Sequence, residues 1–269
     1  MRRGEVQKGS ATALVTGASS GIGRAFAERL AALGYNIVAV SDNAEHLAAV
    51  ATELQAAHAD VKVTAHAADL AAVDAGERLY EWTREEGIEV EVLVNDAGMF
   101  SFCDLLDTPA ERIRRMILLH DMTIAMTCRL FGEKMAERGH GYILNMSSYS
   151  LWMPFPGLGL YSASKAFVRN FSMSFAKEVR ERGVKVTALC PAGVSTDLYG
   201  LSKSLQKVGL RTGILISPDS CARRGLKALW RGRRSSVPGW WNRLGIPFCL
   251  YMPMWLTRIA RRFTKKFQK

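Results

Sequence analysis

The sequence lacks paired cysteine motifs and any hydrophobic run long enough to cross a membrane. Its five cysteines are odd in number and include no CxxC arrangement, so neither disulfides nor a bound metal is expected. The first apolar run, residues 11–15, is too short for a signal peptide. These absences favour a reducing compartment, and we expect a cytoplasmic protein. The cysteines are Cys103, Cys128, Cys190, Cys221 and Cys249.

Acidic residues are absent from the C-terminal part of the chain. Residues 223–269 contain thirteen Lys and Arg and no Asp or Glu, whereas the rest contains twenty-three basic and twenty-five acidic residues. The net charge of +11 therefore belongs entirely to this segment, because the rest carries −2. A nucleic-acid arm is one interpretation of such a segment, but the near-neutral remainder makes nucleic acid an unlikely partner.

The same segment holds a short apolar stretch followed by an amphipathic pattern. Residues 244–257 are apolar for fourteen positions but contain Pro247 and Pro253, so they are too short and broken to span a bilayer. After them, an aromatic or aliphatic side chain recurs every fourth residue among basic residues, at Trp255, Ile259, Phe263 and Phe267. Such a helix could lie on an anionic membrane surface, or it could dock on the body of the protein or on a sister subunit.

Short apolar runs alternate with helical patterns along most of the chain. We expect strands at residues 11–16, 37–40, 61–65, 92–94, 142–146, 184–190 and 235–237. Helices are expected at residues 24–33, 44–57, 73–86, 110–138, 161–182 and 218–230. This alternation predicts an α/β, Rossmann-like doubly wound parallel sheet in a single domain, residues 1–239, with a basic extension at 240–269.

A glycine-rich turn follows the first expected strand. Its sequence, residues 16–23, lets backbone N–H groups approach a pyrophosphate at a helix N-terminus. A tight turn that binds nothing is the alternative. A phosphate loop for nucleotide hydrolysis does not fit, because Arg24 stands where a Gly-Lys-Ser/Thr sequence is needed.

Two acidic residues follow the second and third expected strands. Asp42 could accept hydrogen bonds from an adenosine ribose and repel a 2′-phosphate, and its neighbours Ser41 and Asn43 include no arginine. NAD(H) is therefore favoured over NADP(H), although Asp42 could instead cap the following helix. Asp69 would suit the adenine amino group or, again, a helix cap.

Tyr161 and Lys165 lie one helical turn apart, with Ser148 upstream. A phenol has a pKa of about 10 in water, and a nearby ammonium favours its ionised form. The pattern predicts a proton-transferring tyrosine with a serine hydroxyl that holds the substrate oxygen. A second pair, Tyr199 and Lys203, has the same spacing. We interpret it as accidental, because its flanking segment lacks helical periodicity.

With these residues in place, the chain resembles the short-chain dehydrogenases/reductases between residues 12 and 239. Their TGxxxGxG turn matches Thr16, Gly17, Gly21 and Gly23, their NNAG turn appears as residues 95–98, and their catalytic serine, tyrosine and lysine match Ser148, Tyr161 and Lys165. The resemblance implies a seven-stranded sheet, hydride exchange with a nicotinamide cofactor, and a homodimer or homotetramer. The cofactor residues expected from turn and resemblance together are Gly17, Ser19, Ser20, Gly21, Ile22, Gly23, Asp42, Asp69, Leu70, Asn95, Ala97, Gly98, Tyr161, Lys165, Pro191, Ala192, Val194 and Thr196.

Three positions depart from the family pattern. His120 stands where the family often carries an asparagine; it could relay a proton in catalysis or be a buried imidazole satisfied by a carbonyl. Ala192 replaces the glycine of a Pro-Gly pair, and Asp96 replaces the second asparagine of NNAG. These departures leave open a nucleotide-sensing binding module with little or no catalysis.

Three loops are expected around the nicotinamide, at residues 99–102, 149–160 and 194–213. The first two are rich in aromatic side chains, which predicts an apolar wall and a bulky hydrophobic alcohol or ketone as substrate. The third is long enough to act as a lid. Alternatively, these side chains pack against each other or against a subunit partner.

Overall fold

A computed structural model of the chain describes residues 6–200, 202–251, 253 and 257. Seven strands form one parallel sheet in the order β3-β2-β1-β4-β5-β6-β7. The central strands are continuous apolar runs because helices cover both of their faces. The strands are β1 (Thr12–Thr16), β2 (Asn36–Ser41), β3 (Val63–Ala67), β4 (Val90–Asn95), β5 (Gly141–Met146), β6 (Val184–Leu189) and β7 (Ser235–Ser236).

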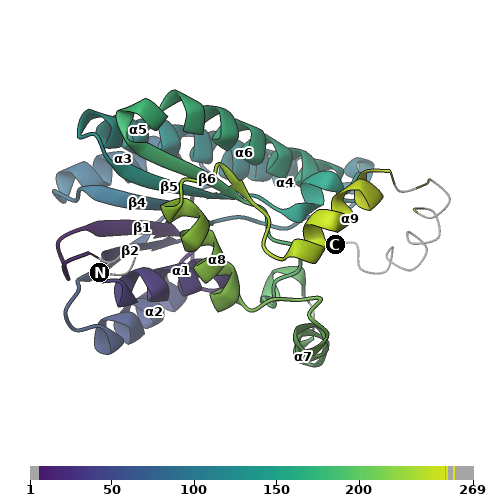
Figure 1. Cartoon of the computed structure of the whole chain (residues 1–269), viewed down its shortest axis with the longest axis horizontal. Helices are drawn as coiled ribbons and strands as arrows, with labels where there is room; N and C mark the ends of the chain where they lie inside the picture. Colours follow the sequence, from purple (N-terminus) through teal and green to yellow (C-terminus); the bar gives the residue numbers. More distant parts are fainter. Residues whose placement is uncertain (1–5, 201, 252, 254–256, 258–269) are drawn as a thin grey trace.

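Helices pack against both faces of this sheet, as Figure 1 shows. One face is covered by α1 (Gly21–Ala32), α2 (Ala44–Ala57) and α8 (Pro218–Trp230). The other face is covered by α3 (Ala75–Glu85), α4 (Ala110–Ile117), α5 (Thr123–Glu137) and α6 (Gly159–Glu178). Each layer buries its own apolar core against the sheet, centred on Phe26 and Leu30 on the first face and on Phe131 and Met135 on the second. The predicted Rossmann-like α/β fold is thereby confirmed.

Short helical turns connect several of these elements. They are η1 (Leu105–Asp107), η2 (Leu118–Met122), η3 (Tyr149–Trp152), η4 (Arg180–Arg182) and η5 (Asp197–Tyr199). The η2 segment is a π-helix inserted between α4 and α5. The expected helix over residues 110–138 is therefore interrupted around His120, and such insertions are frequent at functional sites.

The segment after β6 differs most from the sequence-based expectation. Residues predicted as a loop contain α7 (Lys203–Thr212), so the prediction that this segment lacks helical order was wrong. Ser202 caps α7 by accepting the Leu205 N–H, and Gly213 ends it in a left-handed conformation. These are ordinary helix boundaries. The helix was missed because its buried face carries Gln206 and Gly209 instead of apolar side chains.

One further helix, α9 (Trp240–Leu250), lies in the predicted C-terminal extension. The expected amphipathic pattern from Trp255 to Phe267 lies outside the described residues. Among the described residues, none of the helices has both the length and the apolar content needed to cross a bilayer. The five cysteines are all free.

Candidate active site

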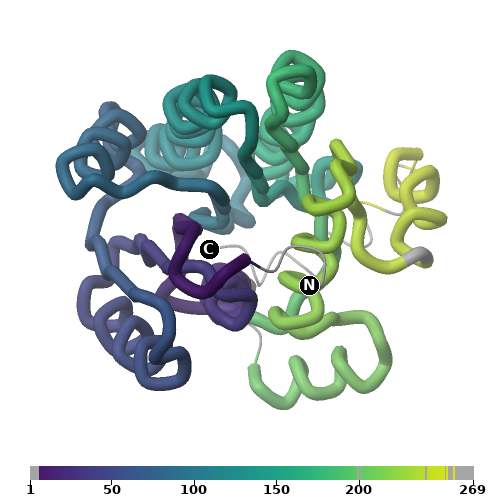
Figure 2. Tube along the Cα trace, turned by 60° about the vertical axis from the view of Figure 1, so that its left-hand side comes forward, coloured from purple at the N-terminus to yellow at the C-terminus, as the bar shows by residue number. Residues whose placement is uncertain are grey.

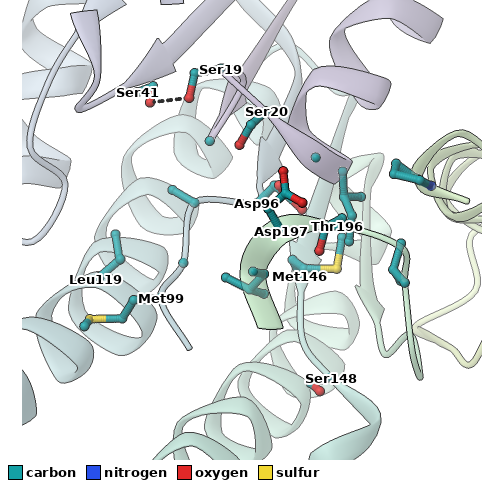
Figure 3. A pocket seen from close by; sticks show the side chains of 18 of the residues that line it. Ser19, Ser20, Ser41, Asp96, Met99, Leu119, Met146, Ser148, Thr196 and Asp197 are labelled. Carbon is teal, nitrogen blue, oxygen red and sulfur yellow. Dashed lines mark hydrogen bonds between the residues drawn. The ribbon is translucent and has the colours of Figure 1, made fainter. Parts of the chain in front are cut away.

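A cavity of about 540 Å³ lies at the carboxyl ends of the strands. It is lined by residues that follow β1 through β6, as expected for ligands of doubly wound sheets. Figure 2 shows the helices arranged around the periphery of the molecule, and Figure 3 shows the cavity from close by. Of the predicted site residues, those that line it are Gly17, Ser19, Ser20, Gly21, Ile22, Asp42, Asp69, Leu70, Ala97, Gly98, Ser148, Tyr161, Lys165, Pro191, Val194 and Thr196.

The glycine turn has a backbone that side chains would obstruct. Gly17 and Gly21 have φ angles of 69° and 57°, which L-residues rarely adopt. A Cβ on Gly23 would lie 2.3 Å from the Gly17 carbonyl oxygen. The turn therefore brings the N-terminus of α1 to the cavity, where a pyrophosphate fits the partial positive charge and the backbone N–H groups.

The turn is fixed to the neighbouring strand by Thr16. Its Oγ1 accepts the backbone N–H groups of Asp96 and Ala97, each at 3.0 Å. This links the glycine turn after β1 to the turn after β4. Both walls of the expected pyrophosphate site are thereby held by one hydroxyl.

Asp42 lies at the adenosine end of the cavity and does not cap α2. The cap is Asn43, whose side chain accepts the His46 N–H at 2.9 Å. Ser41 Oγ donates to Asp42 Oδ1 at 3.3 Å and lies 2.8 Å from Ser19 Oγ, a link drawn in Figure 3. The alternative interpretation of Asp42 as a helix cap was therefore wrong, and Asp42 lines the cavity instead.

Asp69 forms an ion pair that the sequence did not indicate. Arg115, on α4, donates to both carboxylate oxygens at 2.9 and 3.2 Å, and the Ala71 N–H donates to Oδ1 at 2.9 Å. The Arg115 guanidinium holds the pKa of Asp69 below its usual value. Asp42 also acts electrostatically on Arg115. An arginine therefore stands at the adenosine end after all, although it comes from a distant helix.

Asn95 faces away from the cavity. Its Nδ2 donates to Asn145 Oδ1 at 2.9 Å, and its Oδ1 accepts the Thr127 hydroxyl at 3.2 Å. These bonds tie β4 to β5 and α5 in a fully buried polar cluster. Three other predicted site residues do not line the cavity either, namely Gly23, Ala192 and His120.

Tyr161 and Lys165 lie on one face of α6 and are both buried. The Lys165 Nζ lies 5.8 Å from the centre of the Tyr161 ring and donates to the Met146 carbonyl oxygen at 3.0 Å. Ser148 follows β5, and its hydroxyl accepts the Ser150 N–H at 3.1 Å. All three side chains line the same cavity. This arrangement can hold a carbonyl oxygen and exchange a proton with it.

His120 is fully buried, with both ring nitrogens in hydrogen bonds. Its Nε2 accepts the Met99 N–H at 3.0 Å, so the ring proton is on Nδ1, which lies 2.9 Å from Ser164 Oγ. Ser164 in turn donates to the Tyr161 carbonyl oxygen at 2.9 Å. Burial and the nearby Lys165 charge lower the pKa of His120 well below 6.5. The imidazole is thus satisfied by an amide and a hydroxyl, not by the carbonyl that the sequence suggested.

The half-buried Asp96 and the buried Lys165 interact electrostatically near the glycine turn. Burial raises the pKa of Asp96 to about 7, while Lys165 and a hydrogen bond from the Gly23 backbone oppose that rise. Burial lowers the pKa of Lys165 to about 8, and Asp96 and Asp121 oppose that fall. Asp121, on η2, has a pKa raised to about 6 by burial. The neighbouring carboxyl groups of Asp96 and Asp121 therefore favour the charged form of Lys165.

Aromatic side chains of the expected substrate loops contact each other. The rings of Phe100 and Tyr161 meet edge to face at 5.1 Å, and Phe102 lies 6.2 Å from Phe155. In the third loop, Leu198 lines the cavity, and Lys203 does so at the start of α7. Lys203 forms an ion pair with Asp197 at 2.7 Å. Lys203 belongs to the Tyr199 and Lys203 pair that we interpreted as accidental, yet it lies beside the cavity.

Residues 11–206 match the family model described as short chain dehydrogenase. The chain belongs to the short-chain dehydrogenase family. This is a family of NAD(P)-dependent oxidoreductases that act on CH–OH groups.

Several relatives of this short-chain dehydrogenase act on acyl or steroid groups according to their names. It is 32% identical to a very-long-chain 3-oxoacyl-CoA reductase of Pyricularia oryzae over 88% of this chain and 70% of the relative. It is 35% identical to a 17-beta-hydroxysteroid dehydrogenase type 3 of Danio rerio over 71% of this chain and 63% of that one. A protein of Pongo abelii named inactive hydroxysteroid dehydrogenase-like protein 1 is 31% identical over 91% and 73%. The chain spans about two thirds of the length of these relatives.

Solved structures of other short-chain dehydrogenases have the same fold. One from Sphingobium yanoikuyae, in complex with NADPH, is 27% identical with a TM-score of 0.77 and 95% of each chain covered. A structure of a 7β-hydroxysteroid dehydrogenase is 25% identical with a TM-score of 0.82, covering 96% of this chain and 98% of that one.

Sequence reasoning missed four charged residues of this short-chain dehydrogenase that line the cavity, namely Asp96, Arg115, Asp197 and Lys203. Asp96 was noticed but assigned only to local packing. Arg115 is the second of two adjacent arginines on a helix with a strongly charged face, and nothing in the spacing shows which of them turns toward Asp69. Only the three-dimensional arrangement separates it from Arg114.

Proposed function

We propose that the protein is an NAD(H)-dependent oxidoreductase that interconverts a hydroxyl and a ketone on a bulky hydrophobic substrate. The observation that carries this proposal is the pairing of Tyr161 and Lys165 on one face of α6, both buried and both lining the cavity that Ser148 closes. A buried ammonium beside a phenol stabilises the phenolate, so the tyrosine can give and take a proton near neutral pH.

Each residue has a role that follows from its position. Ser148 donates a hydrogen bond to the substrate oxygen, and Tyr161 transfers a proton to or from that oxygen. Lys165, anchored by the Met146 carbonyl at 3.0 Å, keeps its charge close to the phenol and would help to hold the ribose of a bound nicotinamide nucleotide. The nicotinamide, when bound, supplies or accepts the hydride. His120 holds Ser164 and the first turn of α6 in place, and a role in proton relay would have to break one of its two hydrogen bonds.

The cofactor part of the proposal rests on Asp42. Its exposed carboxylate lines the cavity where a ribose would lie, and a 2′-phosphate there would be repelled. NAD(H) is therefore preferred and NADP(H) less favoured. The NADPH complex of the Sphingobium yanoikuyae protein and the position of Arg115 make this preference moderate in size.

The substrate part rests on the apolar loops and on the relatives. Phe100, Phe102 and Phe155 lie in the two loops next to Tyr161, and the relatives include an acyl-CoA reductase and a steroid dehydrogenase by name. We therefore favour acyl-CoA or steroid-like ketones and the corresponding alcohols. A homodimer or homotetramer in the cytoplasm, with or without a peripheral membrane contact, completes the proposal.

The test is the substitution Tyr161→Phe, with Tyr142→Phe as a matched control. Tyr142, on β5, packs on Trp230, far from the cavity. Tyr161→Phe should keep the Kd for NADH within about threefold and lower kcat by about 10²- to 10⁴-fold, the usual contribution of a general acid. Tyr142→Phe should leave both unchanged. Undiminished turnover in Tyr161→Phe would rule out the proposed role.

A second candidate is a nucleotide-binding protein with little or no catalysis. It is favoured by the similarity to a relative named inactive and by the unusual His120 and Ala192. The two candidates separate in one experiment, which offers both cofactors with a panel of hydrophobic alcohols and ketones and follows NADH absorbance. Tight cofactor binding without turnover of any compound would favour the second candidate.

A further inference from the structure

One face of α9 exposes a stripe of large apolar side chains. Trp241, Leu244, Phe248 and Tyr251 are 61–82% exposed. Their spacing of three, four and three residues places them on the same side of a helix. We call these four residues the α9 stripe. Single exposed apolar residues need no explanation, whereas a contiguous row of this size marks a contact surface.

The opposite side of α9 packs beside the proposed catalytic loop. Cys249 Sγ donates to Tyr149 Oη at 3.7 Å, and a Cβ on Gly245 would lie 2.9 Å from the same oxygen. Tyr149 directly follows Ser148 and opens η3. The helix is therefore attached to the body through its inner side, and the α9 stripe points outward.

The chain around the stripe is strongly basic. Residues 198–269 contain sixteen Lys and Arg and a single acidic residue, Asp219. Six of these basic residues follow residue 257 in the sequence, beyond the end of α9 at Leu250. An occupant of the α9 stripe must therefore present both an apolar phase and negative charge.

A second helix also has exposed apolar residues. Leu205, Val208 and Ile214, on and just after α7, are 56–74% exposed. In Figure 2, α7 lies at the bottom and α9 at the right, both away from α2 and α3 at the left. The helices α7 and α9 carry Lys203, Lys207, Arg211 and Arg243 and no acidic residue. This part of the chain also forms part of the cavity wall through Leu198 and Lys203.

We propose that this part of the chain docks on the surface of an anionic lipid bilayer, with the α9 stripe inserted at the headgroup level. Tryptophan and tyrosine favour that level because their rings are apolar with one polar atom. Basic residues add attraction to anionic lipids. A second copy fits less well, since two strongly positive segments would meet, and nucleic acid offers no apolar phase for Leu244 and Phe248. The docking would place the loop that carries Ser148 close to a membrane that dissolves hydrophobic ketones.

The test measures binding of the full-length protein to vesicles by sedimentation, without any turnover. Vesicles of phosphatidylcholine with about 30 mol% phosphatidylglycerol are compared with phosphatidylcholine alone. The test variant is the double substitution Leu244→Glu and Phe248→Glu. The matched control is Val73→Glu with Leu106→Glu, two apolar residues outside α7 and α9 that are at least as exposed as the substituted pair (71% and 99%). Thermal unfolding of each variant checks that it is folded.

The wild type should bind anionic vesicles at least about tenfold more tightly than neutral ones, and raising the salt to about 0.5 M should weaken that binding by screening. The test variant should lose at least about tenfold in affinity, and the control should not. Equal binding of wild type and test variant would overturn the proposal, as would a wild type that binds no vesicles. A wild-type dimer in light scattering that becomes monomeric in the test variant would also overturn it, since the stripe would then be buried between copies. These outcomes are independent of the proposed hydride transfer, because no reaction is measured.

Discussion

His120 and Ser164 share a buried hydrogen bond of 2.9 Å between Nδ1 and Oγ. Because Nε2 already accepts the Met99 N–H, the imidazole is neutral with its proton on Nδ1. Burial and the Lys165 charge lower its pKa well below 6.5. We expect no titration of this ring between about pH 6 and 9. The measurement is the pH dependence of the histidine ring signals in NMR, with His120 assigned by its loss in His120→Asn.

A titrating ring signal that disappears in His120→Asn would contradict this expectation and restore the proton relay. His120→Asn should also lower kcat less than Tyr161→Phe does, because residue 120 touches no reacting atom. Its amide replaces only one of the two hydrogen bonds of the imidazole, so a small loss is still expected.

Asn95 is expected to stabilise the fold more than it binds cofactor. Its substitution by Ala removes one buried hydrogen bond from Asn145 Oδ1 and one from the Thr127 hydroxyl, which keeps its bond to the Thr123 carbonyl. Two such lost bonds typically cost about 1–3 kcal/mol together. Asn95→Ala should therefore lower the free energy of unfolding by about that amount and change the Kd for NADH by less than about threefold. Urea unfolding and fluorescence titration measure the two quantities.

Asp42→Asn provides the opposite pattern as a control. Its carboxylate is exposed at the cavity, so stability should stay within about 0.5 kcal/mol while the Kd for NADH rises. A large change in Kd for Asn95→Ala at unchanged stability would place Asn95 in the cofactor site after all.

The sheet could be predicted from the sequence because the buried strands are continuous apolar runs flanked by turns. Strand limits moved by two residues at β3 and β4, since Val61 is buried without pairing and Val90 extends the ladder. The helix α7 was not predicted, because its buried face carries Gln206 and Gly209 rather than apolar side chains, and its limits are marked by Ser202 and Gly213. Local caps of this kind leave only a weak trace in a hydrophobic pattern.

The site was predictable where a residue directly follows a strand and therefore lines the cavity at the carboxyl edge of the sheet, as Gly17, Asp42 and Ser148 do. It was not predictable where two residues compete for one partner. Asn95 follows β4 but turns to Asn145 inside the core, and Arg115 reaches Asp69 across 46 positions of sequence. Such choices depend on packing between elements, and a single sequence does not contain that information.

Arg115 is expected to reduce discrimination against a 2′-phosphate. Its guanidinium neutralises Asp69 at the adenosine end, where Asp42 adds a second negative charge. Removing the cation leaves two carboxylates near the ribose, which repel NADPH more than NADH. Arg115→Gln should therefore raise the ratio of the Kd for NADPH to that for NADH by about tenfold. Fluorescence titration with both cofactors gives this ratio.

Arg114→Gln is the matched control, because Arg114 precedes Arg115 on α4, pairs with Glu111 and does not line the cavity. The control should leave the ratio unchanged. If both substitutions change it equally, the effect comes from net charge and not from the position of Arg115.

The pair Asp96 and Lys165 predicts the pH dependence of ketone reduction. Lys165 has a pKa of about 8, lowered by burial, so its ammonium form is present below pH 8 and is lost as the pH rises through it. Reduction that depends on this charge should fall above about pH 8, by up to about tenfold per pH unit. Ionised Asp96, with a pKa of about 7, opposes the loss of the Lys165 charge. In Asp96→Asn that support is missing, so the alkaline fall of kcat/KM should begin at lower pH.

The profile is measured with NADH and with deuterated NADH, so that the isotope effect shows where hydride transfer limits the rate. An alkaline limb that stays in place in Asp96→Asn would mean that Lys165 does not sense this carboxyl group, and a rate that rises above pH 8 would mean that its ammonium is not required.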